Sequence, residues 1–195
     1  MIEEIEYKLN SLNSEKLSGK PQAAVLIAIL NYEKYINSPE LIYTQRSSHL
    51  STHSGEVSFP GGKSDQCDKN LFETALRESK EEMNLKSQDV TKLGKLNYII
   101  SRHDIEVNPF VATINKPQIL SPNEEIQSIF TVPLDFLLDQ KNIQREIIQR
   151  QGKIWHVPTW TIKDQKIWGL TAMITINFLN LCFDANIEIL EGKLK

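Results

Sequence analysis

The 195-residue chain is poor in cysteine, in positive charge and in long apolar runs. Two cysteines, Cys67 and Cys182, provide no disulfide framework and are typical of a reducing compartment, so we expect a cytoplasmic protein. The formal net charge of −3 argues against a basic surface for nucleic acid. No run of about 18 apolar residues and no cationic, apolar leader is found, so neither a membrane span nor a membrane partner is expected.

The length is typical of one domain, which we place over residues 1–195. Within residues 1–20, the spacing of Ile2, Ile5 and Leu9 predicts a short amphipathic helix. The apolar face of this helix could pack on a second copy, so a homodimer is one expectation. The polar segment 184–195 is expected to fray.

Apolar, β-branched stretches and polar turns predict the other elements. Pro109 predicts that its strand lies at a sheet edge or carries a bulge. Strands and helices do not alternate regularly, which favours an α/β fold with a mixed β-sheet and helices on both faces. We expect strands at 23–30, 41–45, 56–59, 90–101, 105–114 and 126–132, strand pieces in 144–162 around a turn at Gln151-Gly152, and helices at 133–138 and 170–182.

Residues 72–83 predict a helix with one apolar face and one acidic face. At about 100° per residue, Phe72 and Met83 lie on the same side, while Glu78, Glu81 and Glu82 gather on another. Like charges three and four residues apart repel, and a divalent cation such as Mg²⁺ would relieve that repulsion. The alternative is a solvated acidic face, which is the commoner fate of glutamates in helices.

A glycine pair precedes the helix. Phe59-Pro60-Gly61-Gly62 follows an apolar strand and predicts a tight turn at which the backbone approaches a phosphate closely. Most glycine turns are only turns, so the pair gains meaning from the acidic helix that follows it.

Together these residues resemble the Nudix box, which ends here as Arg77-Glu78-Ser79-Lys80-Glu81-Glu82-Met83-Asn84-Leu85. Asn84 stands where the family usually has glycine, and asparagine also tolerates a left-handed helix cap. The loop between Gly62 and Arg77 is one residue longer than in the common box, and Asp68 lies closest to the position of an early glutamate. The resemblance implies an α/β/α sandwich.

The preceding segment, 41–62, resembles the motif of the coenzyme A diphosphatase branch. A second run, 167–172, is similar to the one that opens the last helix in that branch. The matching positions in the first segment are Arg46, Leu50, His53, Gly55, Ser58 and Phe59.

The resemblance also implies roles for these residues. Glu78, Glu82 and Glu81 would hold Mg²⁺ or Mn²⁺, and Arg77 would orient a carboxylate. A general base is left open among Glu81, Glu124 and Glu125, with Glu81 and Glu125 as the candidate catalytic residues and a solvated loop charge as the alternative for Glu125. The residues expected to contact the substrate are Arg46, His53, Ser58, Phe59, Gly61 and Gly62.

The activity implied is metal-dependent hydrolysis of the pyrophosphate of coenzyme A or its thioesters, giving 3′,5′-ADP and (acyl-)4′-phosphopantetheine. Two alternatives stay open: a Nudix enzyme for ADP-ribose, a dinucleotide or a nucleoside triphosphate, and a Nudix module that binds a nucleotide without cleaving it. The three tryptophans, Trp155, Trp160 and Trp168, are more typical of a core than of adenine stacking.

Overall fold

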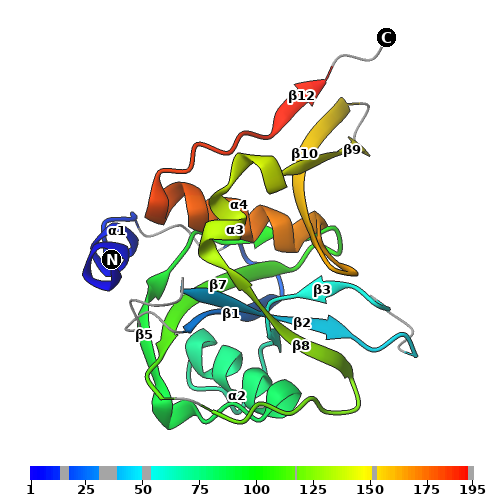
Figure 1. The fold of residues 1–195 in the computed structure, drawn as a ribbon. Helices are drawn as coiled ribbons and strands as arrows, with labels where there is room; N and C mark the ends of the chain where they lie inside the picture. Colours follow the sequence, from blue (N-terminus) through cyan, green and yellow to red (C-terminus); the bar gives the residue numbers. More distant parts are fainter. Residues whose placement is uncertain (14–17, 31–38, 50–53, 117, 151–152, 193–195) are drawn as a thin grey trace.

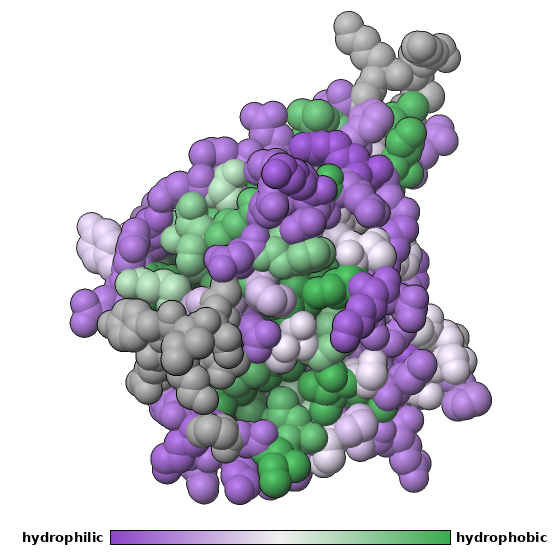
Figure 2. Space-filling view, viewed as in Figure 1, coloured by the Kyte–Doolittle hydropathy of each residue, from purple (hydrophilic) through white to green (hydrophobic). Residues whose placement is uncertain are grey.

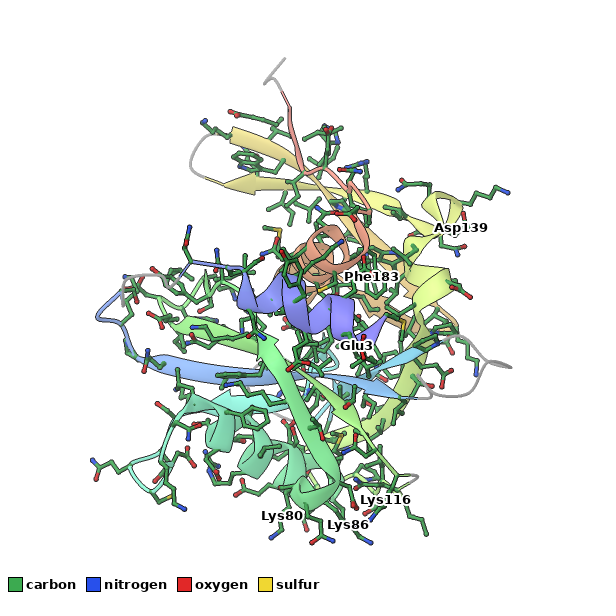
Figure 3. The ribbon with its side chains drawn as sticks, turned by 90° about the vertical axis from the view of Figure 1, so that its left-hand side faces the viewer. Glu3, Lys80, Lys86, Lys116, Asp139 and Phe183 are labelled. Carbon is green, nitrogen blue, oxygen red and sulfur yellow. The ribbon has the colours of Figure 1, made fainter. Side chains whose placement is uncertain are left out.

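The computed structural model describes residues 1–195 apart from 14–17, 31–38, 50–53, 117, 151–152 and 193–195. An eight-stranded sheet forms the middle layer (Figure 1). Helix α2 (Leu71–Met83) covers one face, and α1 (Ile2–Asn10) and α4 (Gly169–Phe183) cover the other. In the side view, Glu3 of α1 and Phe183 of α4 lie on the opposite side of the sheet from Lys80 of α2 (Figure 3). The predicted α/β/α sandwich is confirmed.

The main sheet is mixed, as predicted. Its strands run in the order β3-β2-β1-β7-β5, while β4 pairs with β1, β6 with β7 and β8 with β2. The β1·β7 pair is parallel and the other pairs are antiparallel. The strands are β1 (Gln22–Leu30), β2 (Glu40–Arg46), β3 (Val57–Ser58), β4 (Gly61–Lys63), β5 (Val90–Lys95), β6 (Ile99–Ile100), β7 (Glu106–Ile114) and β8 (Ile126–Pro133).

The expectation for Pro109 was wrong, because β7 is an inner strand between β1 and β5. The bulge in the β5·β7 pair lies between Lys92 and Gly94 of β5, away from the proline. The expected strand 90–101 is broken into β5 and β6, and Pro109 faces the gap between them, where the Leu96 N–H donates to the Pro109 carbonyl at 2.9 Å. In a strand, the backbone N and O of one residue point to the same side. The nitrogen of Pro109 therefore also points to the gap between β5 and β6, where the sheet does not need a hydrogen bond from an N–H group.

The alternation of side chains along β1 produces a core on each face of the sheet. Ala24, Leu26 and Ala28 belong to the cluster that packs with α2, while Ile27 and Ile29 belong to the cluster that packs with α1 and α4. Both faces of β1 are therefore apolar, which matches the continuous hydrophobic run of residues 23–30.

A smaller sheet follows the main one. Strands β9 (Gln144–Arg150), β11 (Gln165–Ile167) and β12 (Leu190–Gly192) all pair with β10 (Lys153–Ile162), and part of this sheet projects from the body (Figure 1). Apolar residues show on the projection in the space-filling view (Figure 2). Ile147 of β9 and Leu190 of β12 are among the exposed large hydrophobic residues. The turn expected at 151–152 lies outside the described residues. The short elements between the sheets are η1 (Ser87–Asp89), α3 (Leu134–Leu138) and η2 (Gln140–Asn142).

Residues 184–192 do not fray as expected, and 193–195 lie outside the described residues. Residues 190–192 pair with β10, and Ile187 is buried in the core. The Asn180 side chain binds both the N–H and the carbonyl of Ile187, at 2.8 and 2.9 Å. The pairing with β10 joins segments that are distant in the sequence, so the polar composition of 184–195 gave no sign of it.

Helix α1 is present, but its apolar face is not available to a second copy. Ile5 and Leu9 are 1% and 3% exposed, and a Cβ on Gly94 of β5 would lie 2.6 Å from the Leu9 Cβ. Lys8 pairs with Asp184 at 2.6 Å, just beyond α4. The amphipathic face therefore packs on its own chain, which removes the basis for a homodimer through this helix. No helix within the described residues is long and apolar enough to cross a membrane.

Candidate active site

Helix α2 begins and ends at asparagines. The Asn70 side chain accepts hydrogen bonds from the backbone N–H groups of Phe72 and Glu73, at 3.0 and 3.1 Å, and so caps the helix. Asn84 ends it in the left-handed conformation, with φ 57° and ψ 33°. The substitution of the family's glycine by asparagine is therefore accommodated, as predicted.

The glycine pair forms strand β4 and not the expected turn, because Gly61 and Gly62 pair with Val25 and Ala24 of β1. The Gly61 N–H donates to the Glu82 carboxylate at 3.1 Å. A Cβ on Gly62 would lie 2.4 Å from the Glu78 Cδ. The absence of side chains at Gly61 and Gly62 thus allows two carboxylates of α2 to lie directly against the backbone of the sheet.

Arg77 holds one group of carboxylates together. Its guanidinium donates to both oxygens of Asp68, at 2.9 and 3.1 Å, and lies 3.0 Å from Glu78 and 3.3 Å from Glu81. It also donates to the Lys63 carbonyl at 3.1 Å, which links the helix to β4. The hydrogen bonds from Arg77 hold the pKa of Asp68 well below its usual range. Arg77 therefore has the contacts of an orienting residue.

Asp68 is the residue whose importance the sequence did not reveal. Its carboxylate is 6% exposed and also accepts from the Thr74 hydroxyl at 2.9 Å. The sequence offered one signal, the position of Asp68 near that of the early glutamate of the common box. Because the loop is longer here, the sequence did not show which side chains Asp68 would contact.

Arg46 joins a second group of carboxylates. It lies at the end of β2, with one nitrogen 3.7 Å from Glu82 and another 3.5 Å from Glu125. Its buried Nε has no hydrogen-bond partner among the described residues. Arg46 thus brings the loop carboxylate of Glu125 to the carboxylates of α2, although 43 residues separate Glu125 from Glu82 in the chain.

Burial changes the ionisation of the two helix carboxylates nearest to β4. The Glu82 side chain is 6% exposed, and burial raises its pKa to about 7 against the opposing effects of the Gly61 N–H and Arg46. Burial likewise raises the pKa of Glu78, against the opposing effect of Arg77. Both groups would be stabilised as anions by additional positive charge.

The donor set fits a divalent cation of the hard type. Two arginines face five carboxylates, those of Asp68, Glu78, Glu81, Glu82 and Glu125, so negative charge is in excess. Carboxylate oxygens are the ligands that Mg²⁺ and Mn²⁺ prefer. In the part of the chain that the structure describes, no three acidic, histidine or cysteine side chains already converge as a metal site. Glu78 and Glu82 are the pair best placed to begin one.

The other predicted residues lie in different surroundings. Phe59 is 2% exposed and packs on Tyr43, with ring centroids 4.6 Å apart, so it belongs to the core and not to a substrate surface. The Ser58 hydroxyl lies 3.1 Å from that of Thr44 on β2. Glu124 is exposed, and Leu50 and His53 lie outside the described residues.

A carboxylate helix held against a glycine strand is suited to the hydrolysis of a pyrophosphate, whose charge needs a cation. The NUDIX domain family model matches residues 20–151, more than half of the chain. The chain belongs to this family and is a Nudix pyrophosphohydrolase, an enzyme class that acts on small nucleotide substrates.

Individual relatives agree with this assignment. The human mitochondrial coenzyme A diphosphatase NUDT8 is 37% identical over 166 residues, which cover 82% of this chain and 69% of that protein. The Nudix hydrolase NudL of Pectobacterium atrosepticum is 36% identical over 154 residues, 78% of each chain.

Solved structures support the fold alone. A MutT/nudix family protein from Enterococcus faecalis superposes with a TM-score of 0.54 at 15% identity, covering 94% of this chain and 70% of that one. An Ap4A hydrolase from C. elegans superposes with a TM-score of 0.50 at 20% identity, covering 60% of this chain and 83% of that one.

Proposed function

We propose that this enzyme hydrolyses the pyrophosphate of coenzyme A or its thioesters, giving 3′,5′-ADP and (acyl-)4′-phosphopantetheine. The observation that carries the substrate assignment is the 37% identity to a protein named as a coenzyme A diphosphatase. The resemblance of segment 41–62 to the motif of the coenzyme A diphosphatase branch gives further support. The NudL relative is bacterial and the human relative is named as mitochondrial, and we place this enzyme in the cytoplasm, which cell fractionation would test.

The proposed cofactor is Mg²⁺ or Mn²⁺, held by Glu78 and Glu82 with Glu81 as a third ligand. When bound, such an ion neutralises phosphate oxygens and makes water more acidic. The protein itself orients these ligands. Strand β4 lies against Glu78 and Glu82 on one side. Arg77, which is held by Asp68, contacts Glu78 and Glu81 directly.

Two carboxylates can accept the proton of the attacking water. Glu81 and Glu125 are 55% and 57% exposed, so each meets solvent, and each is held by an arginine, Arg77 or Arg46. We propose Glu125 as the base and Glu81 as a metal ligand. This assignment predicts that Glu81→Gln weakens the response to metal, whereas Glu125→Gln lowers kcat with that response intact.

The test is an incubation of purified protein with coenzyme A and either metal, with products separated by chromatography. We expect 3′,5′-ADP from the wild type and none from Glu82→Gln. If coenzyme A stays intact while ADP-ribose or a dinucleotide is cut, the proposed substrate is wrong. If no nucleotide is cut, the protein is better described as a Nudix module that binds a nucleotide without cleaving it.

His53 tests the role of segment 41–62 in substrate specificity more directly than Arg46 does. Replacement of Arg46 should reduce turnover of every substrate, because Arg46 contacts the proposed metal ligand Glu82. We expect His53→Ala to reduce turnover of coenzyme A more than that of ADP-ribose. An equal effect on both substrates would make His53 part of the scaffold.

A further inference from the structure

The three tryptophans occupy different environments. Trp160 is fully buried, and its indole N–H donates to the Leu137 carbonyl at 3.1 Å. Trp155 lies on the small sheet with the Lys153 ammonium 5.8 Å from its ring centre. Trp168, in contrast, is 36% exposed at the start of α4. Trp168 is therefore the most exposed of the three tryptophans.

The backbone on both sides of Trp168 is fixed. Ile167 is fully buried and pairs with Trp160 in the small sheet. On the other side, the Thr171 hydroxyl donates to the Val57 carbonyl of β3 at 2.8 Å. Between them, Gly169 has φ +58° with open space where a Cβ would lie. A rigid frame therefore holds an indole ring that is itself partly exposed.

This frame lies at the same end of the sheet as the candidate active site. Along α4, Thr175 contacts Tyr43 at 3.0 Å, and Thr171, one turn earlier, contacts Val57, which pairs with Gln45. Followed back towards its N-terminus, α4 therefore runs along β2 towards Arg46, the last residue of that strand. The N-terminal end of α4 lies over β3 (Figure 1).

Trp168 immediately precedes α4, three residues before Thr171, and so lies beyond Thr171 in this direction, as Arg46 lies beyond Gln45 along β2. Trp168 therefore lies at the end of β2 that carries Arg46, the residue that contacts Glu82 and Glu125, although α4 and α2 cover opposite faces of the sheet.

We propose that Trp168 stacks on the adenine ring of the substrate and is a specificity-determining residue of this enzyme. The inference rests on the proposed function for the identity of the substrate. An indole ring binds a purine through its face, a contact that does not depend on hydrogen bonds and is worth about tenfold or more in affinity. The substrate then extends from the carboxylates around the end of the sheet to α4.

The experiment compares Trp168→Ala and Trp168→Phe with Trp155→Ala, a matched loss of a partly exposed tryptophan on the small sheet. With coenzyme A, we expect Trp168→Ala to raise KM about tenfold with little change in kcat. Trp168→Phe keeps an aromatic face and should stay near the wild-type KM, as should Trp155→Ala. An unchanged KM in Trp168→Ala would overturn the proposal.

Binding of the separate products provides a readout that does not need turnover. We expect 3′,5′-ADP to quench the tryptophan fluorescence of the wild type and of Trp155→Ala, and the quenching to disappear in Trp168→Phe although binding persists by calorimetry. In Trp168→Ala, 3′,5′-ADP should bind about tenfold more weakly, while 4′-phosphopantetheine binds as before. Weakened binding of phosphopantetheine alone would assign Trp168 to the other half of the substrate and refute stacking on adenine.

The two proposals fail in different ways. If coenzyme A is not cut but Trp168→Ala still weakens binding of 3′,5′-ADP or ADP-ribose, the adenine contact holds and the substrate is wrong. If coenzyme A is cut and Trp168→Ala behaves as the wild type in both assays, the substrate is right and the adenine contact is wrong.

Discussion

Gly61 and Glu82 are joined by a hydrogen bond of 3.1 Å from the backbone N–H of the strand to the carboxylate of the helix. Beside it, Gly62 leaves no room for a Cβ next to Glu78. The orientation of the two carboxylates therefore depends on two residues of β4 without side chains, Gly61 and Gly62. The strand itself is fixed, because β4 pairs with the buried strand β1.

Gly62→Ala should reduce activity on the order of a hundredfold. The added methyl group would lie 2.4 Å from the Glu78 Cδ and would displace the carboxylate, and a displacement of about 1 Å is enough for such a loss. Steady-state kinetics with a parallel thermal melt measures this effect. Gly19→Ala is the control: its φ of +73° makes the substitution strained, yet open space surrounds it, so stability should fall with kcat unchanged. Equal kcat in both variants would show that Gly62 has no role in the site.

Addition of Mg²⁺ or Mn²⁺ should raise the melting temperature of the wild type. A ligand that binds only the folded state stabilises it, and Glu78 and Glu82 are the proposed ligands. We expect Glu78→Gln and Glu82→Gln to lose most of the shift, as measured by differential scanning fluorimetry with and without chelator. Glu73→Gln, an exposed glutamate in the first turn of the same helix, should keep the full shift. A shift that survives in Glu82→Gln would place the metal elsewhere.

Asp68→Asn should lower kcat by about 10- to 100-fold, the usual effect of losing a residue that orients a ligand. The substitution removes the charge that holds Arg77, which then no longer fixes Glu78 and Glu81. The melting shift produced by metal should shrink in parallel, which a purely structural loss would not require. Asp65→Asn, in the same loop but bonded to the Cys67 N–H, serves as the control. An unaffected metal response in Asp68→Asn would show that Arg77 does not need Asp68.

Glu106 should make stability depend on pH. Burial alone would raise the pKa of Glu106, but hydrogen bonds from Ser18, Gln22 and Asn108 together lower it to about 2, from 4.5. A carboxylate with a depressed pKa stabilises the fold above its unfolded pKa, and this stability is lost as pH falls towards 2. Glu106→Gln should therefore cost up to about 3 kcal/mol at pH 7 and much less at pH 3. Urea unfolding at both pH values, with exposed Glu3→Gln as the control, measures the difference; a cost that does not change with pH would contradict it.

Local features of the site were readable from the sequence. The acidic face of α2 and the cap at Asn84 depend on residues near one another in the chain, and helix periodicity is enough to place them. The continuous apolar run in 23–30 likewise identified β1 as a central strand. These predictions used only the preferences of single segments.

Long-range contacts were not readable in the same way. Nothing in the sequence pairs Arg46 with Glu82 and Glu125, because the contact depends on β2 ending beside α2. The position of Pro109 was mispredicted for a similar reason, since the break between β5 and β6 is a property of the neighbouring strands. Trp168 was expected in a core, and only the tertiary structure distinguishes it from Trp160.

The two ends of the Nudix box are fixed by contacts of residues outside 64–67, the exposed part of the loop that joins them. Gly62 is held by β1, and Arg77 is held by the Lys63 carbonyl and by Asp68. Residues 64–67 between them are exposed and form a local turn in which Asp68 accepts from the Asp65 N–H. An added residue in 64–67 is taken up in solvent and leaves the carboxylates where they are. Insertions and deletions here should be tolerated during evolution, so the spacing between glycine and arginine is a poor criterion for excluding a sequence from the family.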